Sequence, residues 1–119
     1  MISKIELKGM KFYSYHGVIP QERQVGNIFV VNLVLTAPLQ VAIENDNLQN
    51  TIDYASAYEI VKVEMEMPSN LLEHVAGRIL KSLKSAYPIL SRVEIKLTKL
   101  NPPFGGDLQS VSVILDEEF

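Results

Sequence analysis

The chain has 119 residues with a formal net charge of −3 at pH 7, and 47% of its residues are hydrophobic and 21% charged. This composition is typical of one folded domain and excludes a disordered chain. The absence of cysteine excludes disulfides, thiolate metal sites and a thiol nucleophile. Because only two histidines are present, His16 and His74, a three-histidine zinc site is also excluded.

The basic residues are scattered along the chain and form no patch for nucleic acid or for an anionic membrane. The first residues alternate charged and apolar side chains and include no hydrophobic stretch of the signal-peptide type. No apolar run is long enough to span a bilayer. We therefore expect one cytoplasmic domain over residues 1–119, with no nucleic-acid partner and no membrane partner.

Two β-strands are predicted in the first forty residues. Residues 4–15 alternate, but their apolar positions change from odd to even after Gly9, and a glycine at such a change indicates a β-bulge. Residues 16–26 are polar and are expected to form a loop. The second strand is predicted over residues 28–39, where every odd position from 29 to 35 is apolar. One loop joins the two strands, so they are expected to pair antiparallel.

Two α-helices are predicted next. Residues 44–53 are rich in turn-forming and helix-capping residues. The helix after them is expected to pack through one stripe and to end at residues 67–69. That stripe consists of Tyr54, Tyr58, Val61 and Met65. A second helix is expected to begin near Asn70 and to end at Tyr87 and Pro88. Its apolar face consists of Leu71, Leu72, Val75, Ala76, Ile79, Leu80 and Leu83, with Arg78 on the outer side.

The last two strands are predicted from period-two alternation near residues 92–99 and 110–115. The predicted order is therefore ββααββ. The simplest way to bury the apolar stripes is an α+β fold, a four-stranded antiparallel sheet with both helices on one face. Such a sheet has two open edges, which proteins commonly cover or pair with another chain. We therefore expect a homo-oligomer.

Lys99 is the most informative candidate for chemistry because it continues the apolar face of the third predicted strand. Its ammonium would then lie in a partly dry pocket, where a lysine is suited to acid–base catalysis. The structural alternative is an inward-pointing charge that discourages edge pairing, or a stem that extends along the strand end. The position of one lysine favours the structural alternative.

Glu73 also has two interpretations. Asn70 and Glu73 have the spacing of a capping box at a helix N-terminus. Alternatively, the Glu73 carboxylate would accept two parallel hydrogen bonds from a ligand with adjacent N–H groups. Spacing favours the cap. Considered one at a time, Glu22 is interpreted as a solvated surface charge, Tyr54 as a packing residue, and both histidines as structural residues.

Five segments in order resemble the dihydroneopterin aldolases of folate biosynthesis. They are Leu7–Met10 with Phe12–Gly17, Glu22 before Gly26, Thr51–Tyr54, Asn70–His74, and Thr98–Lys99 with Asn101–Pro103. The resemblance runs from about Ile5 to Leu115. The chain departs from many relatives at Leu100, and its residues 104–108 lack a histidine present in some of them.

The resemblance implies the tunnelling fold, a homo-tetrameric ring or homo-octamer, and pterin sites between neighbouring subunits. It implies a carbon–carbon lyase without cofactor or metal, with Lys99 as general acid and base. Tyr54 of the adjacent subunit and Glu22 would assist catalysis. The residues implied to bind substrate are Glu22, Ile52, Asp53, Tyr54, Leu72 and Glu73. Glu73 would be the pterin anchor, assisted by the backbone of Leu72.

Two other functions remain open at this stage. One is an epimerase acting on dihydroneopterin or its triphosphate, and the other is a non-catalytic oligomer that binds pterins or purines. A triphosphate enzyme is expected to carry clustered basic residues, and none are clustered here. The retained lysine, tyrosine and acidic residues argue against the non-catalytic oligomer. A zinc-dependent pterin synthase of the same fold is disfavoured by the histidine count.

Overall fold

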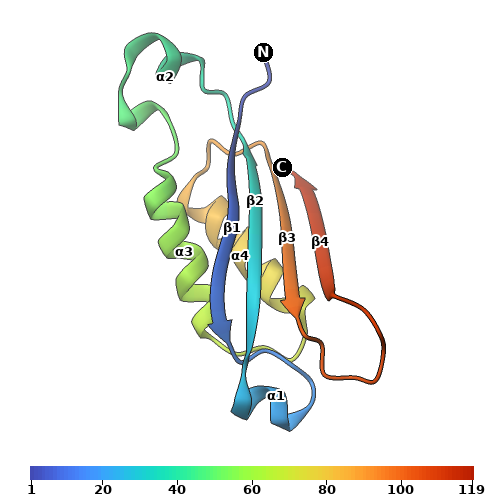
Figure 1. Ribbon diagram of the computed structural model, residues 1–119. Helices are drawn as coiled ribbons and strands as arrows, with labels where there is room; N and C mark the ends of the chain where they lie inside the picture. The colour runs from blue at the N-terminus through green and yellow to red at the C-terminus, as the bar shows by residue number, and fades with distance from the viewer.

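The protein folds as the predicted ββααββ unit with three additional short helical segments (Figure 1). The computed structural model describes all residues from 1 to 119. Its strands are β1 (Lys4–Ser14), β2 (Asn27–Thr36), β3 (Arg92–Leu100) and β4 (Ser110–Glu118). Its helices are α1 (Pro20–Val25), α2 (Gln40–Asn45), α3 (Tyr54–Glu66) and α4 (Leu72–Ala86), with a 3-10 turn, η1, at Leu48–Asn50.

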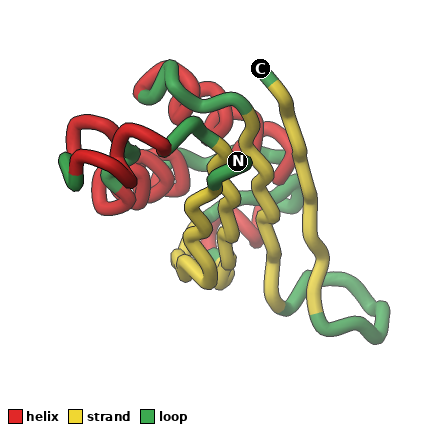
Figure 2. The backbone as a smooth tube through the Cα atoms, turned by 90° about the horizontal axis from the view of Figure 1, so that it is seen from above, coloured by secondary structure: helices red, strands yellow, loops and turns green.

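The strands form one antiparallel sheet in the order β1-β2-β3-β4. The two long helices, α3 and α4, lie on one side of this sheet, which confirms the predicted two-layer arrangement (Figure 2). Helix α3 packs against β1, whereas α4 packs against β3 and β4. The two edge strands, β1 and β4, are therefore covered on the same face by different helices.

The bulge predicted at Gly9 is present in β1. The pairing register between β1 and β2 shifts between Leu7 and Met10. Gly9 has a φ of 74°, a left-handed conformation that favours glycine. Its N–H donates to Oδ1 of Asn32 at 2.6 Å, so the backbone group released by the bulge is still hydrogen-bonded. The glycine thus allows a long strand to bend while its apolar residues stay on the core side.

The core lies between the sheet and the two long helices. The odd positions of β2 and β3, together with Met10 of β1, supply the sheet's contribution. The buried residues from the helices are Ala57, Val61, Met65, Leu72, Val75, Ala76, Ile79, Leu80 and Leu83. Three members of the predicted stripes are exposed rather than buried, and one of them, Tyr58, is 37% exposed with its ring against Phe12. Tyr54 is 68% exposed at the first turn of α3, and Leu71 is half-exposed and precedes α4.

Several predicted boundaries also differ, each for a local reason. Strand β2 ends at Thr36 rather than at residue 39, because Pro38 has no N–H to donate to a ladder. The predicted loop 16–26 contains the short helix α1, which begins at Pro20, a residue preorganised for a first helical turn. No helix in the protein combines the length and apolar character needed to cross a membrane.

Candidate active site

Lys99 forms a close ion pair with Glu22. The Lys99 Nζ lies 2.8 Å from Oε1 of Glu22, and the two side chains are only 13% and 11% exposed. Strand β3 is an interior strand, with Lys99 opposite Phe29 of β2 and Val111 of β4. The interpretation of Lys99 as a charge that protects a sheet edge is therefore wrong. The interpretation of Glu22 as a solvated surface charge is also wrong.

Glu22 is held in place from both sides of its carboxylate. While Oε1 accepts from Lys99, Oε2 accepts the backbone N–H of Ile19 at 3.2 Å. Burial by itself would raise the pKa of Glu22. The hydrogen bond from Lys99, the backbone donors Ile19 and Val18, and the charge of Lys99 outweigh burial and lower that pKa below its usual value. Glu22 is therefore a carboxylate fixed beside the amine.

An aromatic and imidazole layer lies behind this pair. The Lys99 Nζ is 5.9 Å from the centre of the Phe29 ring, within range of a cation–π contact. The His16 ring meets Phe29 edge-on at 5.1 Å. His16 is 1% exposed, its Nδ1 accepts the N–H of Ser69 at 3.1 Å, and its Nε2 has no hydrogen-bond partner. The Lys99 amine therefore has the apolar Phe29 ring on one side and the Glu22 carboxylate on the other.

His16 is held as a neutral imidazole. Burial, with smaller contributions from the positive charges of Arg78 and Lys99, lowers the pKa of His16 to about 4, and only the Met65 backbone opposes this shift. A neutral ring fits the acceptor role of Nδ1 toward Ser69. The position of His16 therefore agrees with its interpretation as a structural residue.

We expect His16 to make folding depend on pH. An unfolded histidine has a pKa of about 6.5, so the unfolded chain binds more protons than the folded chain between about pH 6.5 and pH 4. Stability from the neutral ring is complete above that range and is lost as the pH falls through it. Between pH 7 and pH 5 this loss amounts to about 2 kcal/mol. Urea unfolding at both pH values and one protein concentration measures it.

The matched variant for this measurement is His16→Asn, whose amide oxygen can still accept from Ser69 but does not titrate. Other groups, including Glu22, also contribute to the pH dependence, and the comparison of the two proteins removes their share. The variant is expected to lose about 2 kcal/mol less than the wild type between the two pH values. Parallel losses would show that the imidazole of His16 remains accessible to protons in the folded protein.

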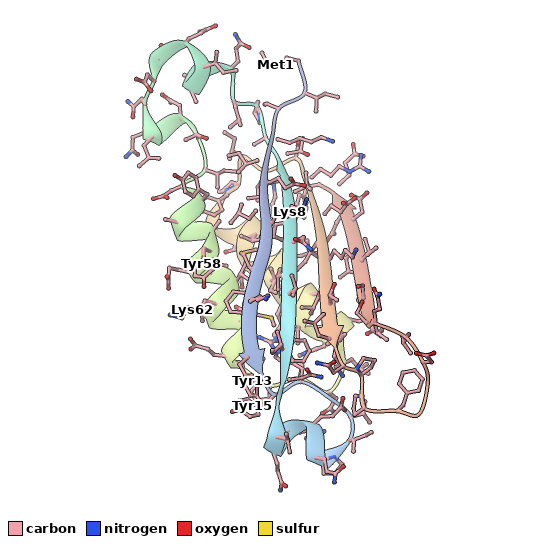
Figure 3. The ribbon with its side chains drawn as sticks, viewed as in Figure 1. Met1, Lys8, Tyr13, Tyr15, Tyr58 and Lys62 are labelled. Atoms are coloured by element: carbon pink, nitrogen blue, oxygen red, sulfur yellow. The ribbon has the colours of Figure 1, made fainter.

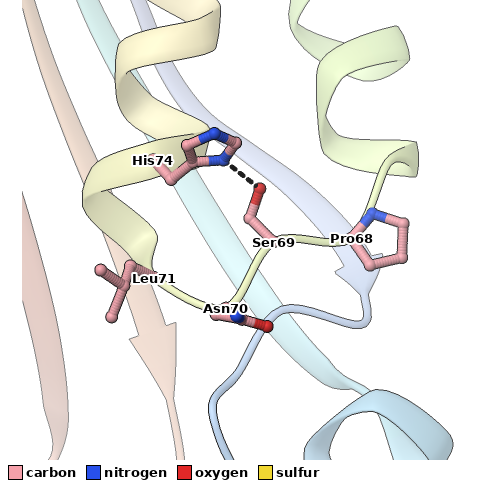
Figure 4. Close-up of a pocket in the computed structure, with 5 residues that line it drawn as sticks. All are labelled: Pro68, Ser69, Asn70, Leu71 and His74. Atoms are coloured by element: carbon pink, nitrogen blue, oxygen red, sulfur yellow. Dashed lines mark hydrogen bonds between the residues drawn. The ribbon is translucent and has the colours of Figure 1, made fainter.

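The turn between α3 and α4 is fixed by a polar network. Arg78 donates to the carbonyl of Glu64 at 2.9 Å and to its carboxylate at 2.7 Å, to the Met67 carbonyl at 2.7 Å, and to Ser69 Oγ at 3.0 Å. Ser69 Oγ also lies 2.7 Å from Nδ1 of His74 (Figure 4). Arg78 was predicted on the solvent side of α4, but it is partly buried because it bonds this turn. The contact of His74 with Ser69 agrees with its interpretation as a structural residue.

A shallow pocket lies on the outer side of this turn. It has a volume of about 370 Å³ and is lined by the residues drawn in Figure 4, which are Pro68, Ser69, Asn70, Leu71 and His74. Neither Lys99 nor Glu22 lines it. The Lys99–Glu22 pair instead adjoins a second pocket of about 400 Å³ that includes Glu22, Asn27 and Asn101. The second pocket is the one in contact with the acid–base pair.

The Glu73 carboxylate is not used by the fold. Helix α4 begins at Leu72 with Leu71 as its N-cap, and no side chain caps it. Asn70, the predicted capping residue, accepts instead from Arg23. The capping-box interpretation is therefore wrong, because the chain enters the helix one residue later than predicted. Glu73 is exposed, and no other residue of the chain bonds its carboxylate, so that group is available to a ligand.

Tyr54 lies away from Lys99 within the chain. It opens α3 at the end next to α2, whereas β3 reaches Lys99 at the opposite end, near α1 (Figure 1). Asp53 serves as the N-cap of α3 through the N–H of Ala55 at 3.0 Å, and Ile52 is buried. Tyr54 shares a pocket of about 430 Å³ with Lys8 of β1 and Tyr58 of α3, both labelled in Figure 3.

The structure therefore divides the predicted site residues into two groups. Lys99 and Glu22 form one direct contact, and the bond from Arg23 to Asn70 places the start of α4 beside α1 in the same region. Ile52, Asp53 and Tyr54 form a second group on the β1 side of the sheet. No group of three or more His, Asp or Glu residues is arranged to hold a metal ion.

These features describe an α+β protein in which a largely buried lysine–carboxylate pair lies beside a pocket. The fold is that of the dihydroneopterin aldolases. The E. coli dihydroneopterin aldolase, solved in complex with neopterin, is 21% identical with a TM-score of 0.88 over 97% of this chain and 98% of that one. A Burkholderia thailandensis dihydroneopterin aldolase bound to guanine is 21% identical with a TM-score of 0.80 over 99% and 92%.

Sequence comparison gives the family. The profile of the dihydroneopterin aldolase (FolB) family matches residues 5–116. The dihydroneopterin aldolase of Staphylococcus epidermidis is 39% identical over 115 residues, which cover 96% of this chain and 95% of the relative. The chain belongs to the dihydroneopterin aldolase family, whose members are enzymes of folate biosynthesis.

Proposed function

We propose that this enzyme cleaves 7,8-dihydroneopterin into 6-hydroxymethyl-7,8-dihydropterin and glycolaldehyde, using neither a metal nor a lysine Schiff base. The observation that carries the proposal is the Lys99–Glu22 pair, an amine held 2.8 Å from a carboxylate and largely removed from solvent. Such an amine can accept and return protons at a fixed place. A Schiff base would need a carbonyl on the substrate, whereas here the pterin ring supplies a C=N bond beside the cleaved side chain.

The reaction balances with side-chain acid–base groups alone. Lys99, in its neutral amine form and acting through an ordered water, takes the proton from the hydroxyl on the carbon that leaves as glycolaldehyde. The bond between that carbon and the ring-attached carbon breaks, and its electron pair passes into the ring C=N. Lys99 then returns the proton to the ring-attached carbon. If glycolaldehyde adds back to the same intermediate through the opposite face of its carbonyl, the alcohol on the re-formed carbon is inverted, which gives an epimerase side activity.

Glu73 is proposed as the anchor of the pterin ring. A pterin presents an amino group and a ring N–H side by side, and a carboxylate can accept both in parallel hydrogen bonds. The Glu73 carboxylate has no partner within the fold, and the first N–H groups of α4 are free of intrahelical acceptors. The backbone of Leu72 lies among them. Glu22 is proposed to hold the hydroxylated side chain of the substrate, because it already contacts Lys99.

Tyr54 is proposed to complete the site from the adjacent subunit, next to the backbone of Ile52 and Asp53. Tyr54 and these two neighbours lie on the β1 side of the sheet. Helix α4, which carries Glu73, covers the β3 and β4 side. If the open edge of β1 pairs with the open edge of β4 in a neighbouring copy, and the copies are shifted along the strands, the Tyr54 group of one copy lies beside the Lys99 and Glu73 of the next. In a homo-tetrameric ring, alone or stacked as a homo-octamer, every such edge strand is paired with a neighbouring copy.

Subunit complementation tests this assignment. Lys99→Ala and Tyr54→Ala chains are each expected to be nearly inactive alone. When equal amounts are unfolded together and reassembled, about a quarter of the shared sites receive Lys99 from one chain and Tyr54 from the other. Glycolaldehyde release should therefore recover to about a quarter of the wild-type rate. Activity that stays at the level of the separate variants would place both residues in one subunit.

The reaction itself is tested by incubating the wild-type protein with 7,8-dihydroneopterin in the presence of a chelator and measuring glycolaldehyde directly. Release of glycolaldehyde together with the hydroxymethyl pterin supports the proposal. Inversion of the side-chain alcohol with no glycolaldehyde would instead identify an epimerase. Binding of the pterin with neither product would identify a non-catalytic binding protein.

A further inference from the structure

Gly17 connects three parts of the site. Its N–H donates to the Ser69 carbonyl at 2.9 Å, and its own carbonyl accepts from Nε of Arg23 at 3.1 Å. Its α-carbon, which carries no side chain, lies against the Glu22 carboxylate, and a Cβ atom at this position would overlap that carboxylate. The backbone at Gly17 therefore contacts the turn before α4, the helix α1 and the carboxylate that pairs with Lys99.

Helix α1 has little internal support of its own. It contains six residues, none of them buried, and so short a helix is not stable in isolation. Glu22, on this helix, must nevertheless stay within hydrogen-bond distance of Lys99. Contacts from α1 to the rest of the protein therefore decide where the Glu22 carboxylate lies.

Arg23 makes such a contact. Its Nε bonds the Gly17 carbonyl, and its Nη2 bonds the side-chain oxygen of Asn70. Asn70 lies in the turn that leads directly into α4, where Leu72 and Glu73 begin the helix. One guanidinium thus joins the segment that carries Glu22 to the segment that carries Glu73, and its planar set of donors suits two acceptors at once.

We infer that Arg23 is a positioning residue, which fixes Glu22 relative to the start of α4 by bonding the Gly17 carbonyl and Asn70 together. This inference rests on the proposed function, in which Glu22 holds the substrate side chain and Glu73 the ring. Removal of Arg23 leaves Glu73 on its long, well-packed helix and releases α1. The ring anchor is then intact while the side-chain contact is displaced.

Two ligands separate these effects. Guanine carries an amino and ring N–H edge without the side chain, whereas neopterin carries both. In Arg23→Ala, we expect neopterin affinity to fall about tenfold and guanine affinity to change less than twofold, as measured by calorimetry. Turnover of 7,8-dihydroneopterin should fall about tenfold through kcat, because a displaced group no longer meets the reacting atoms. Arg23→Lys should lie between, because its donors all sit on one nitrogen and cannot match the two separated guanidinium nitrogens that bond Gly17 and Asn70.

Gln24→Ala is the matched control, because Gln24 lies on the same short helix, is exposed and bonds no other residue through its side chain. It should behave as wild type. Asn70→Ala should reproduce the loss of neopterin affinity, and the double variant Arg23→Ala/Asn70→Ala should be no worse than either single variant. Additive losses would overturn the inference, as would an equal weakening of guanine and neopterin.

The test also separates this inference from the proposed reaction. If the wild-type protein binds neopterin but releases no glycolaldehyde, the proposed reaction fails, while the neopterin-to-guanine comparison still reports the position of Glu22. If the wild-type protein cleaves dihydroneopterin and Arg23→Ala matches Gln24→Ala in every measurement, the positioning role fails and the reaction stands. Circular dichroism of Arg23→Ala should match that of the wild type, since α1 contains only six residues.

Discussion

Replacement of Lys99 by alanine is expected to reduce cleavage of 7,8-dihydroneopterin by about 10²–10⁴-fold, the usual contribution of a positioned proton-transfer group. The proposed pterin anchor, Glu73, does not contact Lys99, so guanine affinity should change little. Glu22 loses its partner in this variant, and its pKa should rise toward the ordinary range because the hydrogen bond and charge of Lys99 lower it in the wild type. Single-turnover glycolaldehyde release measures the rate.

Lys96→Ala is the control for this substitution. Lys96 lies on the same strand, is exposed and points to the opposite face of the sheet. It should keep full activity, which separates loss of the specific amine from loss of any positive charge on β3. A Lys99→Ala protein that cleaves dihydroneopterin at the wild-type rate would remove Lys99 from the chemistry, and would leave Glu22 or Tyr54 as the remaining candidate.

The fold could be predicted because its periodic signals are long and agree with one another. Apolar residues occupy the odd positions of β2 and β3, and α4 has a wide apolar face. These surfaces are removed from water only if the helix packs on the sheet. The short helices α1 and α2 were not predicted, since six residues are too few to show a helical period. Their form depends on contacts that are distant in sequence.

The candidate site was predictable only in part for a related reason. Strand alternation placed Lys99 on the core side, but its partner Glu22 is 77 residues away in sequence, and no local pattern joins them. The predicted cap at Asn70 failed because α4 begins one residue later, and the Asn70 oxygen accepts from Arg23 instead. Resemblance to a family supplied Glu22, Tyr54 and Glu73 as candidates, whereas Arg23 became visible only through its hydrogen bonds.

Glu73 gives the second large expected effect. Glu73→Ala is expected to weaken guanine binding by about 3 kcal/mol, roughly a hundredfold, because a carboxylate that accepts two hydrogen bonds is lost. Glu73→Gln keeps the shape of the side chain but replaces one acceptor with a donor facing a ligand N–H, so it should bind guanine nearly as poorly. Neither substitution should lower the free energy of unfolding by more than a few tenths of a kcal/mol, since the carboxylate bonds nothing in the fold.

Glu66→Gln is the appropriate comparison, because Glu66 is an exposed glutamate at the end of α3 whose side chain has no partner in the chain. It should bind guanine as the wild type does. Calorimetric titration of the three variants with guanine then separates two roles for Glu73. A ring anchor changes the affinity for guanine, whereas a favourable charge in the first turn changes helix stability without changing that affinity. If Glu73→Gln binds guanine as tightly as the wild type, the pterin ring must lie elsewhere. The unused carboxylate would then act only on the dipole of α4.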